Sequence, residues 1–298
     1  MDGLTYKISF FTVKAMAKIL QDKFWYFIAY RKVHYLDGFY YILSFDCDTQ
    51  EDAEAALALY HRLRKEKIYG VYAVPGELLE KHQSIYKEIA HDPQNEFINH
   101  GYYTHTFWCK ERSRHESCFF YNELSPKKII DDIRRGDQTL RNVLNLPPLG
   151  FRAPHFGCFQ RPENLKLIHS TIKELNYIYS SSTVPIYSSI YGPIIKMNDL
   201  FEFPVTGTFS QPGHILDSWA FFAAPDRNNT PEDYAKELKQ LTTFLNRANQ
   251  TKESYLINLY VDPSHVIEND IFLNAIKELN SRAQNITYSS LLKKIEIL

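Results

Sequence analysis

The sequence predicts an α/β fold built on a barrel-like, closed sheet. Short apolar runs alternate with amphipathic stretches over most of the chain, as strands and helices do around a parallel sheet. The first run, Tyr40–Phe45, shows almost no polar alternation, which is typical of a strand covered on both faces. No repeat or linker divides residues 36–298, so we expect one large domain there.

In the first half of this domain, each predicted strand is followed by a predicted helix. Acidic residues fill the first turn of the first helix, where they interact favourably with the helix dipole. Ser125 and Pro126 suit the N-cap and first position of the longest helix, and Pro147 and Pro148 stop it. The predicted strands are 40–46, 70–75 and 96–99, and the predicted helices are 51–60, 78–90 and 127–146.

The second half repeats the pattern after a polar, irregular excursion at 107–122. A short strand and turn over 149–157 carry several polar residues, and Thr230 with Pro231 suits the start of a helix. The later predicted strands are 177–182, 202–205 and 255–261, and the later predicted helices are 162–175, 230–246, 270–279 and 289–295.

Composition narrows the possible functions. With 34 Lys and Arg against 35 Asp and Glu, the net charge is −1, so we expect no nucleic-acid partner. The four cysteines form no CxxC pair, and a disulfide scaffold of this size is not expected. We find no secretory signal and no apolar run long enough to span a membrane. A cytoplasmic protein is therefore expected.

Residues 1–35 form an N-terminal extension, and the segment 10–32 is predicted to be an amphipathic helix rich in aromatic residues. One interpretation is peripheral contact with a membrane surface, or docking of a partner. The other interpretation, which we favour, is a helix packed on the domain, because amphipathic helices mostly face cores.

Two aspartates, Asp46 and Asp48, follow the first strand. The carboxyl end of a strand is where α/β folds bind ligands. Side chains at i and i+2 point to opposite faces of a strand, but a turn can bring them together. One carboxylate could then hold a metal while the other acts as a base. The alternative is an ordinary Asp-rich turn.

Two histidines, His100 and His105, follow the third strand. Residues at i and i+5 lie about 140° apart on an α-helix, so only a loop or a π-type turn can bring these rings together. Gly101 makes such a loop easy. With one aspartate they would form a set of two imidazoles and one carboxylate for a divalent metal. The alternative is a pair of surface histidines.

Three segments in order, Ser44–Asp48, His100–His105 and Phe151–Pro154, resemble the first three motifs of the polysaccharide deacetylases (the NodB-homology domain). The resemblance covers roughly residues 36–298. It implies a distorted (β/α) barrel with fewer than eight repeats. It also implies an enzyme that removes acetyl groups from N-acetylated sugars with zinc or another divalent metal.

The resemblance assigns roles to residues that match its motifs. Asp48, His100 and His105 would bind the metal, and Asp46 would be the general base for the attacking water. Arg152 would hold Asp46 and favour its ionised form. The backbone N–H of His155 would help to bind the oxyanion.

Three departures from the family pattern concern the remaining site residues. The histidine pair is usually one residue closer than His100 and His105. The last motif usually has His-Pro, where this chain has Asp262-Pro263, so either His265 or Asp262 is expected to serve as the acid. The fourth motif is best matched at Asp217–Trp219. Asp217 and Trp219 would then contact substrate, although Trp219 could equally be a core or rim aromatic.

The irregular excursion contains Cys109, His115 and Cys118. These residues could form a second metal site, but buried free cysteines are the interpretation that we favour.

The expected function is metal-dependent hydrolysis of an N-acetyl group on a sugar or glycan precursor, in surface polysaccharide biosynthesis. One alternative is an inactive carbohydrate-binding protein on the same fold, and another is a hydrolase of a small non-sugar amide. The expected location is cytoplasmic, and peripheral contact with the inner membrane face through residues 10–32 is the alternative left open. Oligomeric state is not predicted.

Overall fold

A computed structural model describes residues 36–224, 227–249 and 254–295, with positions 11–13, 15, 16, 18, 19 and 24. Most of the expected helix over 10–32, and of the extension 1–35, lies outside the described residues. Of the positions that are described there, Val13 and Phe24 are buried in the main core cluster, whereas Phe11 and Ile19 are exposed.

The strands form one curled, nine-stranded sheet and a separate hairpin. The sheet consists of β1 (Phe39–Asp46), β2 (Val71–Val74), β3 (Glu96–Asn99), β6 (Gly150–Phe151), β7 (Tyr179–Ser180), β8 (Ile195–Met197), β9 (Leu200–Glu202), β10 (Tyr255–Val261) and β11 (Gln284–Asn285). The hairpin consists of β4 (Thr106–Cys109) and β5 (Arg114–Ser117).

The sheet order is β10–β1–β2–β3–β6–β7–β9–β8, with β11 beside β1. Every pairing from β10 to β9 is parallel, and β8 is antiparallel to β9. The chain after β9 reaches back to β10, where the N–H of Thr206 donates to the carbonyl of Asn258 at 2.8 Å. The expected distorted (β/α) barrel is therefore confirmed.

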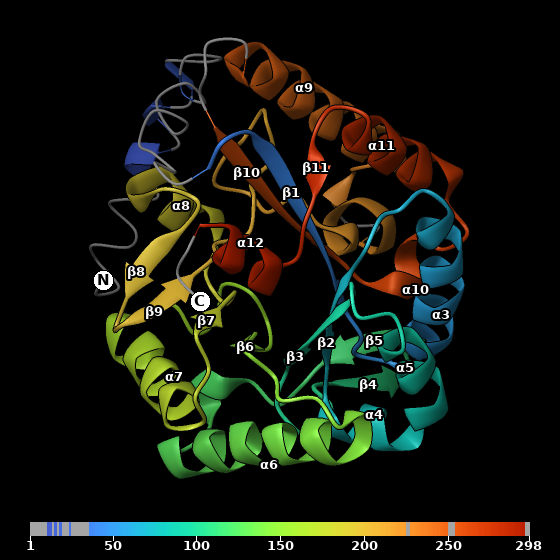
Figure 1. Cartoon of the computed structure of the whole chain (residues 1–298), viewed down its shortest axis with the longest axis vertical. Helices are drawn as coiled ribbons and strands as arrows, with labels where there is room; N and C mark the ends of the chain where they lie inside the picture. The colour runs from blue at the N-terminus through green and yellow to red at the C-terminus, as the bar shows by residue number, and fades with distance from the viewer. Residues whose placement is uncertain are drawn as a thin grey trace.

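Most of the helices surround the curled sheet, and the last one lies over its centre (Figure 1). The helices are α3 (Gln50–Lys65), α4 (Gly76–Lys81), α5 (Gln83–Ala90), α6 (Pro126–Leu144), α7 (Pro162–Glu174), α8 (Pro185–Tyr191), α9 (Pro231–Asn249), α10 (Pro263–Val266), α11 (Asp270–Asn280) and α12 (Tyr288–Lys294). None of the described helices is long and apolar enough to cross a membrane.

Strand β1 separates the two main parts of the core. All its residues are buried, and alternate side chains point to opposite faces, as strand geometry requires. Tyr41 and Leu43 belong to the cluster under the outer helices, and Tyr40 and Ile42 to the cluster inside the barrel. Residues of α12 complete the inner cluster, and this helix lies over the centre of the ring in Figure 1.

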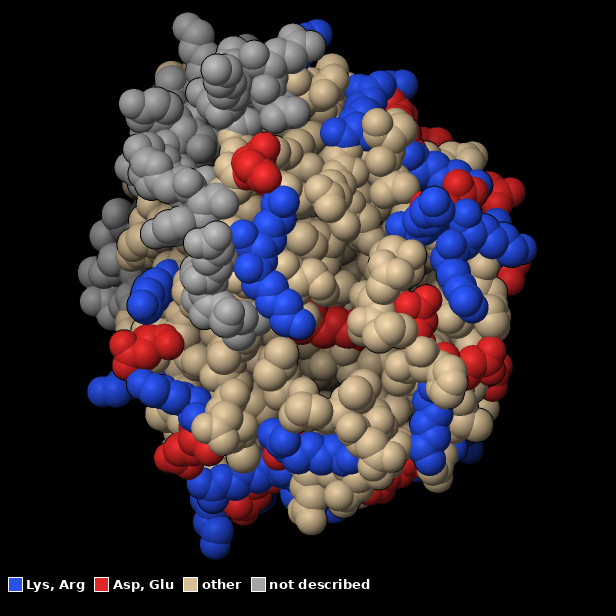
Figure 2. Space-filling view, in the orientation of Figure 1, with Lys and Arg blue, Asp and Glu red and all other residues tan. Residues whose placement is uncertain are grey.

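The molecular face in that same orientation is shown in Figure 2. Over its described residues, acidic and basic side chains are interspersed, and neither sign gathers into a broad patch. This distribution agrees with the net charge of −1.

The predicted helix over 78–90 is wrong as a single element. The chain leaves helical geometry at His82, with φ −116° and ψ 32°, and forms α4 and α5 instead. The two short helices have different neighbours: α4 packs mainly on α6, and α5 packs on α3 as well. Tertiary packing therefore divides a sequence whose local pattern is continuous.

The excursion over 107–122 was expected to be irregular, but it contains the antiparallel hairpin β4–β5. Most of its side chains are exposed, so no buried face generates an apolar alternation that the sequence could reveal.

Other differences concern short elements. The strand expected over 177–182 shrinks to β7, and the one expected over 202–205 lies earlier, as β9. Elements that were not predicted are α8, α10, β8, β11, a 3-10 turn, η1 (Tyr121–Glu123), and a π-helical turn, η2 (Trp219–Ala223). Each has too few residues to show a period.

We predict that Leu43→Ala lowers the free energy of unfolding by about 2–5 kcal/mol, because it leaves a cavity in fully buried β1. The matched control is Leu146→Ala at a position that is 44% exposed, where a change within about 0.5 kcal/mol is expected. Urea unfolding measures both. Equal losses in the two variants would contradict the assignment of β1 to the core.

Candidate metal centre

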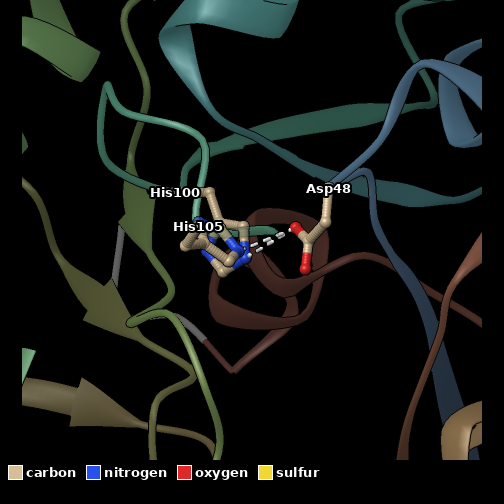
Figure 3. A group of neighbouring side chains, drawn as sticks. All are labelled: Asp48, His100 and His105. Atoms are coloured by element: carbon tan, nitrogen blue, oxygen red, sulfur yellow. Dashed lines mark ion pairs between the residues drawn. The ribbon is translucent and has the colours of Figure 1, made fainter. Parts of the chain in front are cut away.

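Three side chains that are distant in sequence meet at the carboxyl edge of the sheet. Asp48 lies just after β1, His100 directly follows β3, and His105 ends the loop before β4. Their donor atoms all lie within 4.8 Å of one another, and Figure 3 shows the three side chains pointing toward one another. Parallel strands end at one edge of a sheet, so this convergence follows from the fold.

The closest approach joins Asp48 and His105. Nε2 of His105 lies 2.9 Å from Oδ1 of Asp48, and Nε2 of His100 lies 3.4 Å from the same oxygen. Oδ1 of Asp48 and both ring nitrogens of His105 are buried without a hydrogen-bond partner. Buried polar atoms are rarely left unsatisfied. A carboxylate and two imidazoles are zinc-type ligands, so these residues fit a divalent cation.

The orientation of His100 supports this fit. Its Nδ1 lies 2.8 Å from the carbonyl oxygen of Arg152. A carbonyl only accepts, so Nδ1 is the donor and Nε2 is the ring nitrogen that faces Asp48. Such a partner on the second ring nitrogen is typical of histidines that bind metals.

Opposite charges shape the titration of the cluster. Burial tends to raise the pKa of Asp48, but His105 and His100 outweigh it and hold that pKa well below its ordinary value. Burial lowers the pKa of His105, and the Asp48 carboxylate outweighs burial and raises it. The Asp48 carboxylate thus favours the protonated form of His105, and metal binding would have to displace that proton.

A loop, and not a helix, brings the rings of the two histidines together, although they are five residues apart. Gly101 has φ +80°, and a Cβ there would lie 2.2 Å from Oδ2 of Asp132. Oδ1 of Asp132, on α6, accepts from the N–H groups of Tyr102 and Tyr103, both at 2.9 Å. The N–H of Thr104 donates to Glu77 of α4 at 2.9 Å. Two helices therefore hold this loop in shape.

Asp46, the other aspartate of the first motif, is held by a buried arginine. Nη1 of Arg152 donates to Oδ1 of Asp46 at 2.5 Å. Nη2 of Arg152 donates to Ser44 at 2.8 Å, to Tyr288 at 3.0 Å and to Ser181 at 3.2 Å. Arg152 is fully buried, so this hydroxyl cage fixes both the guanidinium and the carboxylate.

Oδ2 of Asp46 lies 4.0 Å from Nε2 of His100, which places this carboxylate beside the metal ligands. Burial raises the pKa of Asp46, and Arg152 acts in the opposite direction without cancelling it. The guanidinium favours the ionised form, as expected, but the net shift is upward because burial is the larger effect.

His155 packs against the ring of His105. It adopts a left-handed backbone with φ +58°. Its Nε2 donates to the carbonyl of Cys118 at 2.7 Å, and its ring lies 5.1 Å from that of His105 and 4.4 Å from that of Phe120. Burial, with help from His105, lowers the pKa of His155 to about 4. The role of its backbone N–H stays a prediction.

The two candidates for the acid form one unit. Nδ1 of His265 lies 3.0 Å from Oδ2 of Asp262 and 3.2 Å from Oγ of Ser218. Ser218 donates to Oδ2 of Asp262 at 3.0 Å and accepts from its N–H at 2.7 Å. Burial lowers the pKa of His265, but Asp262 outweighs it and the net pKa is raised.

The two candidates from the fourth motif have different surroundings. Asp217 accepts from the N–H of Ala220 at 2.7 Å and from the hydroxyl of Tyr260 at 3.1 Å. Burial raises its pKa to about 6. Trp219 is 47% exposed, and the guanidinium of Arg227 lies 4.6 Å from its ring. Trp219 is thus a surface residue and not part of the core, whereas Asp217 is buried.

Asp52 was not among the predicted site residues. Its Oδ2 accepts from the N–H groups of Asp48 at 3.2 Å and Thr49 at 3.0 Å, and its Oδ1 accepts from the N–H and the hydroxyl of Ser264 at 3.0 and 2.6 Å. It therefore joins the Asp48 loop to the turn that carries His265. In the sequence, Asp52 stands out only as the third residue after Thr49, a spacing typical of a capping box. Such a spacing indicates the start of a helix and not a role in a site.

The excursion does not supply a second cluster. Among the described residues, Asp48, His100 and His105 are the one group of three such ligands that converge. Cys109 is buried, and His115 pairs with Glu51 at 3.4 Å.

We predict that the wild-type chain binds one Zn²⁺ and that His105→Ala weakens this binding more than about 100-fold, since losing even an outer partner of a ligand costs 10–100-fold. Isothermal titration calorimetry measures the affinity. The matched control is His115→Ala, which should leave it unchanged. Loss of binding in the control alone would place the metal in the hairpin instead.

Residues 37–166 match the family model described as polysaccharide deacetylase. A search of curated proteins by sequence finds no match. Among solved structures, a candidate polysaccharide deacetylase from Mycobacterium smegmatis is 18% identical with a TM-score of 0.59, covering 87% of this chain and 91% of its own.

Two further structures share the fold. The Puue allantoinase is 11% identical with a TM-score of 0.63, covering 86% of this chain and 89% of its own. The other is a mutant, with restored enzymatic activity, of a CE4-family pseudoenzyme from Bacillus anthracis. It is 13% identical with a TM-score of 0.51, covering 86% of this chain and 68% of its own. At these identities the likeness concerns the fold.

Proposed function

Since the chain is a divergent member of the polysaccharide deacetylase family, we propose that it hydrolyses the N-acetyl amide of a sugar or glycan precursor and releases acetate. The observation that carries this proposal is the convergence of Asp48, His100 and His105 beside Asp46. These residues come from two of the three motifs on which the resemblance was based.

Asp48, His100 and His105 would hold a divalent cation, with zinc favoured by the two imidazoles. When bound, such a cation polarises the amide carbonyl and makes water more acidic. The N–H of His155 would add a hydrogen bond to the oxygen that becomes negatively charged.

Asp46 is the proposed general base. Its Oδ1 is occupied by Arg152, whereas Oδ2 faces the ligand side, 4.0 Å from Nε2 of His100. Oδ2 is therefore the atom that would take a proton from the attacking water. Arg152 keeps the carboxylate in this orientation.

His265 is the proposed general acid, with Asp262 as its partner. The contact between Nδ1 and Asp262 leaves Nε2 as the atom that would deliver a proton to the departing amine. A raised pKa keeps more of the imidazole protonated near neutral pH. In this scheme Asp262 orients the imidazole of His265 and favours its protonated form.

A catalytically inactive carbohydrate-binding protein is the second candidate. The observation in its favour is Asp262, which stands where the family pattern has a histidine. Hydrolysis of a small non-sugar amide is a further outcome that a substrate panel would reveal. Cytoplasmic location, membrane contact through residues 10–32 and a role in surface polysaccharide biosynthesis rest on the sequence alone.

We predict that Asp46→Asn lowers kcat at least about 100-fold, as removal of a general base does, with little change in KM or zinc content. Acetate release from N-acetylglucosamine oligomers measures the rate. Wild-type protein that binds zinc and glycan but releases no acetate from any acetylated sugar would favour the binding protein.

The pH profile separates the two candidate acids. With His265 as the acid, kcat falls as pH rises through the raised pKa of this imidazole, because the proton is lost there. His265→Ala should lower kcat about 100-fold and remove that alkaline limb. Asp262→Asn should keep the limb but shift it to lower pH, because the carboxylate raises the pKa. Activity abolished in Asp262→Asn and retained in His265→Ala would make Asp262 the acid.

A further inference from the structure

The β4–β5 hairpin is bonded directly to the metal-ligand residues. The hydroxyl of Thr106 donates to the carbonyl oxygen of Asp48 at 2.8 Å. At the other end, the N–H of Cys118 donates to the carbonyl oxygen of His105 at 2.8 Å. Both ends of the hairpin are therefore fixed to the loops that form the site.

Strand register divides the hairpin into two faces. Thr106 pairs with Ser117, and Trp108 with His115, so these four side chains share one face. The same face contacts Asp48 through Thr106, and Glu51 of α3 through His115 at 3.4 Å. The opposite face carries Phe107, Cys109, Arg114 and Glu116.

Trp108 is half-exposed on the face that adjoins the site. It is 53% exposed, and its ring lies 5.1 Å from that of His115 at an interplanar angle of 71°. His115 is in turn paired with Glu51. The indole is thus supported from one side, with much of its surface left to solvent.

A second half-exposed tryptophan, Trp219, also lies next to a residue that is bonded to the site. The chain has three tryptophans, and Trp108 and Trp219 are 53% and 47% exposed. Trp219 follows Ser218, which donates to Asp262. Trp108 lies on β4, whose first residue, Thr106, donates to the carbonyl oxygen of Asp48.

We propose that Trp108, with His115 and Glu51, binds a second sugar of the substrate, next to the sugar that loses its acetyl group. This inference rests on the proposed function and narrows it to a glycan chain rather than a free monosaccharide. The apolar face of a pyranose would cover the exposed indole. The imidazole and the carboxylate offer a donor and acceptors to its hydroxyl groups.

The kinetic test compares N-acetylglucosamine with its tetramer on the zinc-loaded enzyme. Wild-type protein should prefer the tetramer. Trp108→Ala should raise KM for the tetramer about 5–10-fold, a size that one aromatic contact accounts for. The kcat for the tetramer and both kinetic constants for the monomer should stay unchanged. Trp108→Phe should recover part of the loss. Phe107→Ala, on the opposite face of the same strand, is the matched control and should behave as wild type.

A binding titration separates this inference from the proposed function. If no acetate is released but the tetramer still binds wild type and Phe107→Ala more tightly than Trp108→Ala, the hydrolase fails and the subsite stands. Equal affinities or KM values in Trp108→Ala and wild type overturn the subsite. The subsite is also overturned if Trp108→Ala and Phe107→Ala lose the same affinity for the tetramer, if Trp108→Ala changes oligomeric state, or if wild-type protein does not bind the tetramer.

Discussion

Oδ1 of Asp48 lies 2.9 Å from Nε2 of His105 and 3.4 Å from Nε2 of His100 inside the protein. This oxygen and both ring nitrogens of His105 have no hydrogen bond, so the ion pair between carboxylate and imidazole is what offsets their burial. The end of β1, the end of β3 and the fixed loop that follows β3 hold the three side chains together. A bound cation would take the place of this ion pair, and the arrangement that the fold maintains is therefore suited to a metal.

The surrounding contacts make this arrangement rigid. Arg152 links two parts of the site, because its carbonyl orients His100 and its guanidinium holds Asp46. Asp52 links the Asp48 loop to the turn of the proposed acid. Tyr288, from the C-terminal α12, reaches Arg152 through the interior of the barrel. Buried hydrogen bonds of Arg152 thus fix one metal ligand and the proposed base, and those of Asp52 join the Asp48 loop to the turn that precedes His265.

The sequence could predict those parts of the fold whose signal is local. The strand predicted over 255–261 matches β10, because a continuous apolar run identifies a strand buried on both faces. The two aspartates of the site were visible for the same reason, since such a run, β1, ends at Asp46 and Asp48 follows it. The hairpin was missed because its exposed faces leave no apolar period. The roles of Ser218 and Asp52 were missed because the partners that connect them to the turn of the proposed acid, Asp262 and Ser264, lie far away in sequence.

X-ray absorption spectroscopy of the zinc-loaded protein tests the central claim most directly. Our account predicts nitrogen and oxygen ligands at about 2.0–2.2 Å, with the scattering pattern of two imidazoles and no sulfur. A zinc–sulfur distance of about 2.3 Å, or a spectrum without imidazole, would contradict it and place the metal elsewhere in the chain.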